Sequence, residues 1–241
     1  MNRAALIALR ELYAYVRSPL GAVIVAAMLL IDGVWFMSQA LGAGARLSAD
    51  VLAEFFHGAS GTTMIAAIAL SMRGLALERE KGTLVVLTTS PATDAEIVVG
   101  KFAAIVTLLA FATALSVYMP VLVLVNGRVS WGHIAVGYLG VLLLGAASAA
   151  IGVFASALAR SQVVAGIVGA VVLGVLLMMW MLARKVDPPL SGLLAGLALH
   201  HEHQRAFMTG VLAPGHVAYY LGVTYVFLFA AVKTLEARRW S

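Results

Sequence analysis

The chain contains no cysteine, so disulfide bonds and thiolate-ligated metal sites are excluded. Charged residues are also scarce: Asp, Glu, Lys and Arg make up 11% of the 241 residues. Soluble domains carry about 25%. Hydrophobic residues make up 62% of the chain, and its mean hydropathy is +0.99. This composition indicates an integral membrane protein rather than a soluble domain.

The sequence has no G-x-x-x-x-G-K-[ST] phosphate-binding loop. Its Gly100-Lys101 step is followed by Phe102, where such a loop requires Ser or Thr. No ATP site is therefore expected in this chain. The net charge of +5 and the pI near 9.7 raise the alternative of nucleic-acid binding. We reject that alternative, because the Lys and Arg residues lie at the edges of apolar runs and form no single basic element.

Six apolar runs are long enough for membrane-spanning helices, each of which needs about 20 residues. The second run is the weakest, because polar residues fall inside or beside it. The sequence therefore predicts an all-α integral membrane protein with six transmembrane helices in one domain, residues 1–241. The expected spans are residues 20–41, a start within 51–62 to 77, 97–125, 133–158, 162–183 and 216–234.

The distribution of Lys and Arg predicts the orientation of these spans. Six spans place both termini on the same side of the membrane. With the N-terminus in the cytoplasm, eleven Lys and Arg residues lie inside and five lie outside. Cytoplasmic N- and C-termini are therefore expected. No signal-peptide cleavage site is evident before the first span, so we expect an uncleaved start.

Two segments outside the spans have their own patterns. Residues 1–19 mix apolar and basic positions, which predicts an amphipathic helix on the inner membrane surface that ends at Pro19. A simple topogenic leader is the alternative interpretation. Residues 184–215 form the longest extracytoplasmic segment, and the apolar part at 190–199 is expected to be a re-entrant or interfacial helix.

The loop at residues 78–96 is unusually polar for this chain. Gly82 follows the Glu-Arg-Glu-Lys run, where a helix can end or bend. Pro91 marks a second break, because the residue before proline avoids the helical region. Thr93 and Glu96 have the spacing of a capping box, which predicts the start of the third span.

The residues between these two breaks begin with four apolar side chains, at positions 84–87. We expect a short cytoplasmic helix there, shaped to dock into a groove on a partner protein. A solvated loop is the alternative, but four consecutive apolar residues argue against it.

The segments EREKGTL, TSPAT and EIVVGK resemble the cytoplasmic loop of ABC-2 type transporter permeases. The chain departs from that family pattern at Val85, where glutamate is frequent, and this removes one expected polar contact. The tail, FMTGVL followed by VAYYLGVTYVFLFAAVKTLEARRW, resembles the gliding-motility-associated permease subunits. Permeases of the nitrous-oxide-reductase maturation transporter have a similar ending.

The resemblance implies an ABC-2 (type V exporter-like) permease fold in a bacterial cytoplasmic membrane. It implies a complex of two permease subunits, the same or related chains, with two ATPase subunits that bind ATP and Mg. The gliding-motility resemblance adds an auxiliary extracytoplasmic subunit. No cofactor is implied for this chain. The residues expected to couple it to the ATPase are Glu78, Glu80, Gly82, Thr83, Leu84, Leu87, Pro91 and Glu96.

Two charged residues within the expected spans are candidates for a role in transport. Asp32 is near the middle of the first span, where a charge costs about 2.5–3.5 kcal/mol, so it should face protein or water. It is either a residue of the transport pathway or subunit interface, or a hydrogen-bonded structural carboxylate. Arg73 is close to the inner end of the second span, where extension to the lipid phosphates is favoured over a role in the pathway.

Small residues and one proline predict how the spans pack. Ser148, Gly152 and Ser156 recur at four-residue spacing, which allows close helix contact. Pro120 should kink the third span, because proline removes a backbone hydrogen bond.

A histidine cluster lies in the external segment, at His200, His201 and His203 around Glu202. Imidazole at this density can bind zinc or copper, and His200 and His203 have the spacing to share a helical face. The pattern is not H-E-x-x-H, so a polar cap of the external surface is favoured and no metal is assigned.

Two other functions compete with transport driven by ATP. A G-x-S-G motif ending at Gly61 matches the nucleophile motif of rhomboid proteases, which requires a base on a neighbouring helix. Ser60 is expected between the first two spans and no histidine inside any span, which disfavours this function. A proton-coupled carrier with Asp32 as the relay would require internal repeats, and none is visible.

Overall fold

The computed structural model describes residues 3–40, 47–84 and 91–238. Most of the predicted coupling helix, residues 85–90 with Leu87, lies outside the described residues. The regular elements of the described part are all helices. They are α1 (Arg3–Arg17), α2 (Pro19–Ala40), α3 (Ser48–Ser71), α4 (Leu75–Glu80), α6 (Asp94–Leu115), α7 (Tyr118–Asn126), α8 (Trp131–Leu158), α9 (Gln162–Ala183), α10 (Leu190–Leu197), α11 (Gln204–Met208) and α12 (Pro214–Ala237).

Within the described residues, six helical stretches are long and apolar enough to cross a membrane, as predicted. The central helix is α8, which packs against α3, α6, α9 and α12. Helices α2, α9 and α12 bury few residues and present apolar side chains outward, as lipid-facing helices do. The stretches are Pro19–Ala40, Ser48–Glu80, Asp94–Asn126, Trp131–Leu158, Gln162–Ala183 and Pro214–Ala237.

The second span begins earlier than expected, at Ser48, and it bends at residues 72–74 before α4. The polar residues that obscured its start lie on one face of α3. Glu54 and His57 are exposed, whereas Phe55 and Phe56 between them are fully buried. A helix with one polar face can expose Glu54 and His57 and still bury the aromatic side chains between them. A simple count of apolar residues misses the start of such a helix.

The third span is interrupted, as Pro120 predicts. Helix α6 ends at Leu115, and α7 begins at Tyr118. Pro120 has no N–H to donate to the Ser116 carbonyl, and the Met119 amide donates to that carbonyl instead, at 3.0 Å. The chain therefore changes direction between α6 and α7.

The small residues of α8 bring it into close contact with α3 and α4, which confirms the expected helix packing. A Cβ added at Gly152 would lie 2.4 Å from the Cβ of Ser71. Ser156 is fully buried, and its hydroxyl accepts a hydrogen bond from the Ala76 amide at 2.9 Å. Ser148 is also fully buried.

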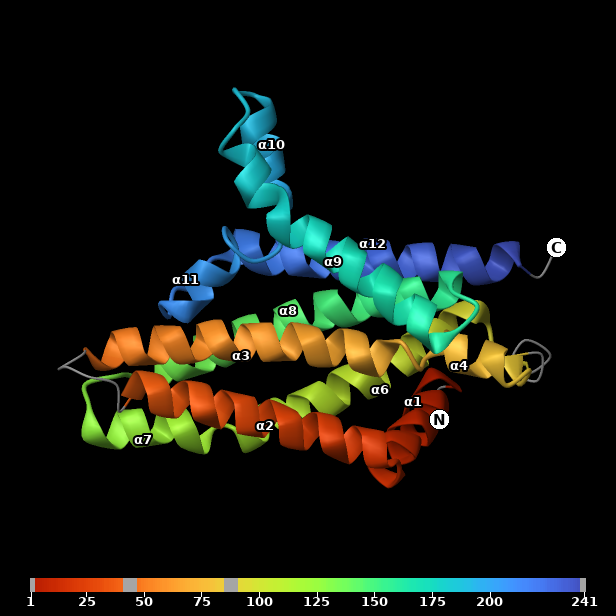
Figure 1. The fold of residues 1–241 in the computed structure, drawn as a ribbon, viewed down its shortest axis with the longest axis horizontal. Coiled ribbons are helices and arrows are strands. Elements are labelled where there is room, and N and C mark those ends of the chain that lie inside the picture. Colours follow the sequence, from red (N-terminus) through yellow and green to blue (C-terminus); the bar gives the residue numbers. More distant parts are fainter. Residues whose placement is uncertain (1–2, 41–46, 85–90, 239–241) are drawn as a thin grey trace.

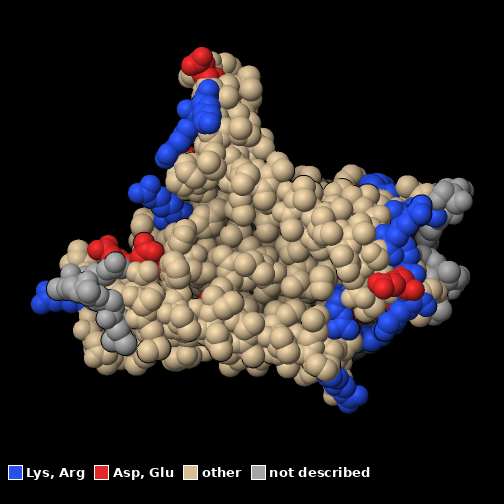
Figure 2. Space-filling model, viewed as in Figure 1, with Lys and Arg blue, Asp and Glu red and all other residues tan. Residues whose placement is uncertain are grey.

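Both ends of the chain point to the same end of the bundle, where α1 and α4 also lie (Figure 1). We call this the charged end, because Lys and Arg gather there (Figure 2). At the opposite end, α10 projects away from the long axis of the bundle (Figure 1).

Candidate functional site

Helix α1 lies against α6 at the charged end. The contact depends on Gly100, where an added Cβ would lie 2.8 Å from the Ala4 carbonyl oxygen and from the Cβ of Ile7. Tyr15 is buried, and its hydroxyl donates to the Leu70 carbonyl at 2.9 Å. The other face of α1 exposes apolar side chains, including Leu6 and Leu9. Helix α1 therefore has one face packed on the protein and one exposed apolar face, and its place at a membrane surface stays a prediction.

Lys101 is the centre of the charged end. Its side chain is 2% exposed, and its Nζ lies 2.7 Å from Glu11 Oε1 and 3.3 Å from Glu78 Oε1. Glu78 Oε1 also lies 3.3 Å from Arg10 Nη2. A buried ammonium requires such partners, because burying an unpaired charge destabilises the fold by roughly several kcal/mol. The ion pairs therefore connect α1, α4 and α6.

The loop after α4 folds back on the same carboxylate. The Thr83 hydroxyl donates to Glu78 Oε2, and the Thr83 amide donates to the Glu78 carbonyl at 2.8 Å. This reversal requires Gly82, whose φ of 71° is rarely accessible to residues with a side chain. The predicted end of the helix at Gly82 is confirmed.

Two further side chains of α4 extend to the next helices. Glu80 Oε2 accepts hydrogen bonds from the Gln162 amide at 3.3 Å and from its side-chain Nε2 at 3.2 Å. Arg79 donates to the carbonyls of Ala159 and Ala157, at the end of α8. Cations at a helix C-terminus are favourable because the last carbonyls lack partners. Helix α4 is thereby connected to α8 and to the start of α9.

The segment that leads into α6 has the predicted capping box. Glu96 N donates to Thr93 Oγ1 at 3.2 Å, and Thr93 N donates to Glu96 Oε2 at 2.9 Å. Pro91 is exposed, and its carbonyl accepts a hydrogen bond from Arg3 on α1. Leu84 is half-buried against the main hydrophobic core.

The structure thus gathers most of the predicted coupling residues at one end and adds three that the sequence did not single out for coupling. Glu80, Gly82, Thr83 and Pro91 are exposed there. The added residues are Arg10 and Lys101, which pair with Glu78, and Glu11, which pairs with Lys101. In the sequence, Lys101 could have been recognised as a charged residue within an apolar span. Nothing in the sequence indicated which residue pairs with it.

Arg73 lies between α3 and α4, and its Nη1 donates to Ser18 Oγ at 3.2 Å. Ser18 separates α1 from α2, so this bond connects the bend in the second span to the bend that follows the surface helix. The side chain of Arg73 is half-buried and has a protein partner. The sequence predicted only that it would extend to the lipid phosphates.

Asp32 is 4% exposed, and its Oδ1 accepts a hydrogen bond from Thr62 Oγ1 at 2.7 Å. The bond joins α2 to α3 in the middle of the bundle. Helix α2 has few other buried residues, which are Gly21 and Met28. Polar contacts of this kind hold membrane helices together, because neither group finds water in the lipid.

We expect Asp32→Ala to weaken the association of α2 with α3 by about 1–2 kcal/mol, because it leaves Thr62 without its interhelical acceptor. The thermal midpoint of the purified protein in detergent measures this loss. Asp32→Asn, which keeps an acceptor oxygen, is the matched control and should retain most of the stability. Equal melting of the wild type and Asp32→Ala would show that the bond has no structural role.

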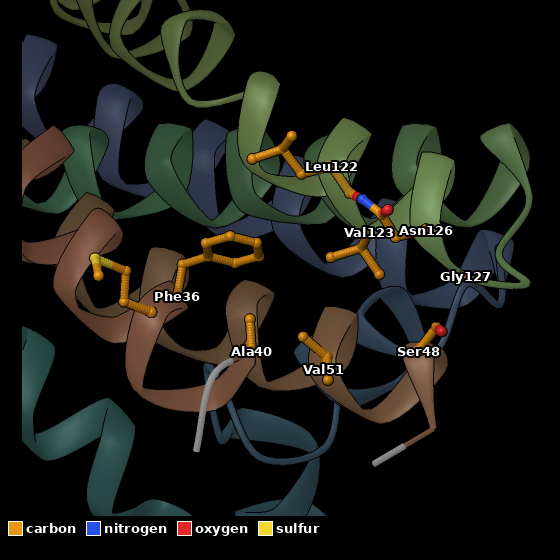
Figure 3. Close-up of a pocket in the computed structure, with 9 residues that line it drawn as sticks. Phe36, Ala40, Ser48, Val51, Leu122, Val123, Asn126 and Gly127 are labelled. Atoms are coloured by element: carbon orange, nitrogen blue, oxygen red, sulfur yellow. The ribbon is translucent and has the colours of Figure 1, made fainter. Parts of the chain in front are cut away.

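An apolar groove of about 550 Å³ lies between α2, α3 and α7 at the end opposite the charged end. Figure 3 shows Phe36, Val51, Leu122 and Val123 around it. Its lining residues include no titratable side chain, so the groove is suited to apolar groups and not to acid–base chemistry.

The histidines of residues 184–215 have separate contact partners. His200 and His203 lie in turns between α10 and α11, so the expectation that they share a helical face is wrong. His203 pairs with His216 at 2.8 Å between their Nδ1 atoms and stacks on Tyr219. His201 stacks on Trp180 instead. Within the described residues, no three His, Cys, Asp or Glu side chains are placed to bind a metal ion.

Ser60 lies inside α3, not between the first two spans, and a histidine does reach it. His200 Nε2 is 2.7 Å from Ser60 Oγ, which corrects the expectation that no base would be near. However, Ser60 Oγ also lies 2.6 Å from the His57 carbonyl oxygen, which can only accept. The single hydroxyl proton therefore goes to that carbonyl, and His200 donates to Ser60.

This direction of donation is opposite to that required of a general base. Ser60 is also fully buried, so no substrate carbonyl reaches its hydroxyl. The pair therefore holds the external segment on α3 and does not provide a protease nucleophile.

Because His200 is half-buried beside Ser60, we expect the protein to lose stability in acid. Burial, with His57 and His201 nearby, lowers the pKa of His200 from 6.5 to about 4. The unfolded chain then binds a proton that the folded chain does not, so stability falls as the pH drops from 6.5 towards 4, by up to about 3 kcal/mol. We expect His200→Gln, which keeps a donor for Ser60, to show a smaller decrease in melting temperature between pH 7 and pH 4.5. The same decrease in both proteins would contradict this role of His200.

The fold and the charged end define a multi-pass helical membrane protein whose polar helices α1 and α4 are linked by ion pairs to its spans. The model of the family described as ABC-2 family transporter protein matches residues 5–216, and the chain belongs to that family. It is a membrane component of an ABC transporter. No curated protein matches the chain.

Proposed function

We propose that the charged end faces the cytoplasm and binds a separate ABC ATPase, which holds ATP and Mg. The observation that supports this most is the ion-pair network at Lys101, because it connects the exposed loop after α4 to three helices. The gathering of Lys and Arg at this end is the distribution expected of a cytoplasmic face (Figure 2).

The predicted coupling helix begins at Leu84 and ends before Pro91, and both of these residues lie at the charged end. Closure of the ATPase would push on this segment. Glu78 would transmit the movement to α6 through Lys101, and Glu80 would transmit it to α9 through Gln162. Packed helices respond to such a push as rigid bodies, which is how small displacements become changes in span arrangement.

The finer assignments follow the resemblance of the sequence. We propose an assembly of two ATPase subunits with two permease subunits, the same or related chains, in a bacterial cytoplasmic membrane. Its work is export or a mechanical task in the envelope. The tail at residues 207–240 favours the gliding-motility-associated permeases, and hence an auxiliary extracytoplasmic subunit.

Purification of the tagged chain from its native membrane tests this function. We expect an ABC ATPase to copurify, with nucleotide hydrolysis inhibited by vanadate, and transport to require ATP and not a proton gradient. Recovery of the chain without any nucleotide hydrolase, under conditions that preserve its membrane partners, would overturn the proposal. Transport that persists without ATP and follows the proton gradient would support the carrier with Asp32 as the relay instead.

A further inference from the structure

A polar pocket of about 370 Å³ lies between α3 and α11, at the end opposite the charged end. One wall is α3, with Glu54 and His57, and the other includes Arg205 of α11. Figure 2 shows acidic and basic side chains close together near the foot of the projecting segment, on the side away from the charged end. The pocket therefore presents a carboxylate and a guanidinium to the same small volume.

These two charges do not neutralise each other. Glu54 and Arg205 form no ion pair within 4 Å, either with each other or with another charged group among residues 3–40, 47–84 and 91–238. Glu54 accepts a hydrogen bond from Trp35 Nε1 at 2.8 Å, but through its backbone carbonyl and not through its carboxylate. Opposite charges that line one pocket without pairing are arranged for a ligand that carries both signs.

The walls of the pocket are held in place by buried contacts. His200 donates to Ser60 at 2.7 Å, and the Leu199 amide donates to the Leu176 carbonyl at 3.2 Å. On the α11 side, His133 Nε2 donates to the Met208 carbonyl at 2.7 Å. The segment that supplies Arg205 is therefore fixed against α3, α8 and α9, and the pocket is preformed.

The level of the pocket along the spans restricts the class of ligand that it can bind. Glu54 and His57 lie in the second and third turns of a span that starts at Ser48, so the pocket is near the membrane surface on the side away from the charged end. Lipid headgroups occupy that level of a bilayer. A headgroup with an ammonium and a phosphate matches the carboxylate and the guanidinium, respectively.

We propose that this pocket binds a zwitterion with an ammonium and a phosphate group, and that its source is the headgroup of an aminophospholipid such as phosphatidylethanolamine. Glu54 accepts hydrogen bonds from the ammonium, and Arg205 donates to the phosphate. The imidazoles of His57 and His201 complete the polar lining. The site does not depend on coupling to an ATPase, and its test needs only the chain in lipid.

Native mass spectrometry of the protein released from nanodiscs measures the retained lipid. We expect phosphatidylethanolamine to be retained over phosphatidylcholine and phosphatidylglycerol from equal mixtures. Glu54→Gln and Arg205→Gln should each reduce that retention about tenfold, since each removes one charge-assisted hydrogen-bond partner. Glu202→Gln and Arg184→Gln are the matched controls, because they remove the same charges from the external segment outside the pocket lining, and they should retain the lipid.

Soluble phosphoethanolamine separates the two sources of the same chemistry. One outcome is that phosphoethanolamine raises the melting temperature of the wild type as much as phosphatidylethanolamine in nanodiscs does. That result would support the zwitterion site, with a ligand that comes from solution. If only the lipid does so, the headgroup is the ligand. Retention unaffected by both pocket variants would overturn the proposal, as would equal losses in the control variants. Binding of phosphatidylglycerol that depends on Arg205 but not on Glu54 would show an anion site and contradict the zwitterion.

Discussion

Lys101→Met should lower the melting temperature of the purified protein by roughly 6–20 °C and abolish ATP-driven transport. The ammonium of Lys101 is 2% exposed, and its partners Glu11 and Glu78 have side chains only 14% and 13% exposed. Removing one member of a buried ion pair costs about 3–5 kcal/mol. Here Glu11 and Glu78 would stay largely buried with Arg10 as their remaining cation. For a chain of this length each kcal/mol shifts the melting temperature by about 2–4 °C. Differential scanning fluorimetry and a transport assay on the same preparation measure both effects.

The chain provides a matched control and a rescue for this prediction. Lys233 pairs with Glu236 at 2.7 Å, but their side chains are 56% and 43% exposed, so Lys233→Met should cost less than about 1 kcal/mol. Adding Glu11→Gln and Glu78→Gln to Lys101→Met removes the two carboxylates that have lost Lys101, and it should restore most of the stability without restoring coupling. A single variant as stable and active as the wild type would show that the network is not required.

Gly100→Leu should detach α1 from α6. A Cβ at this position would lie 2.8 Å from the backbone oxygen of Ala4, and a backbone atom cannot move aside as a flexible side chain can. Overpacking of this kind costs about 1–3 kcal/mol, and we expect α1 to open about tenfold more often as a result. Faster tryptic cleavage after Arg10 measures the opening, and loss of ATP-driven transport measures its consequence.

Gly61→Leu is the control for this substitution, because nothing lies within 4 Å of a Cβ added at Gly61. It introduces the same side chain into a spanning helix and should leave both cleavage after Arg10 and transport unchanged. If Gly61→Leu and Gly100→Leu impair transport equally, the defect would come from changing a helical glycine and not from displacing α1.

The elements of this fold that depend on local sequence could be predicted. Each span follows from a long apolar run, the capping box from Thr93 and Glu96, and the interrupted third span from Pro120. In each case the physical cause lies within a few residues of its effect. The start of the second span was missed because Glu54 and His57 face outward from a helix that is otherwise well buried.

Contacts between distant segments could not be predicted. The bond between His200 and Ser60 joins residues 140 positions apart, and the pair of Lys101 with Glu11 joins residues 90 positions apart. A single sequence shows that a buried charge needs a partner but does not show which carboxylate supplies it. The sequence therefore predicted the candidate site at one loop, while the helix that packs beside this loop, α1, was predicted only as a surface helix.

A single introduced thiol tests most directly whether the charged end contacts the ATPase. The chain has no cysteine, so Thr83→Cys supplies its only thiol, on an exposed residue beside the predicted coupling helix. Thr209→Cys places the same thiol on an exposed residue at the opposite end. We expect a bifunctional thiol-to-amine reagent to cross-link the Thr83→Cys chain to the ATPase in native membranes and to leave the Thr209→Cys chain uncross-linked. Cross-linking from Thr209→Cys alone, or labelling of Thr83→Cys by an impermeant reagent from outside the cell, would contradict coupling at the charged end.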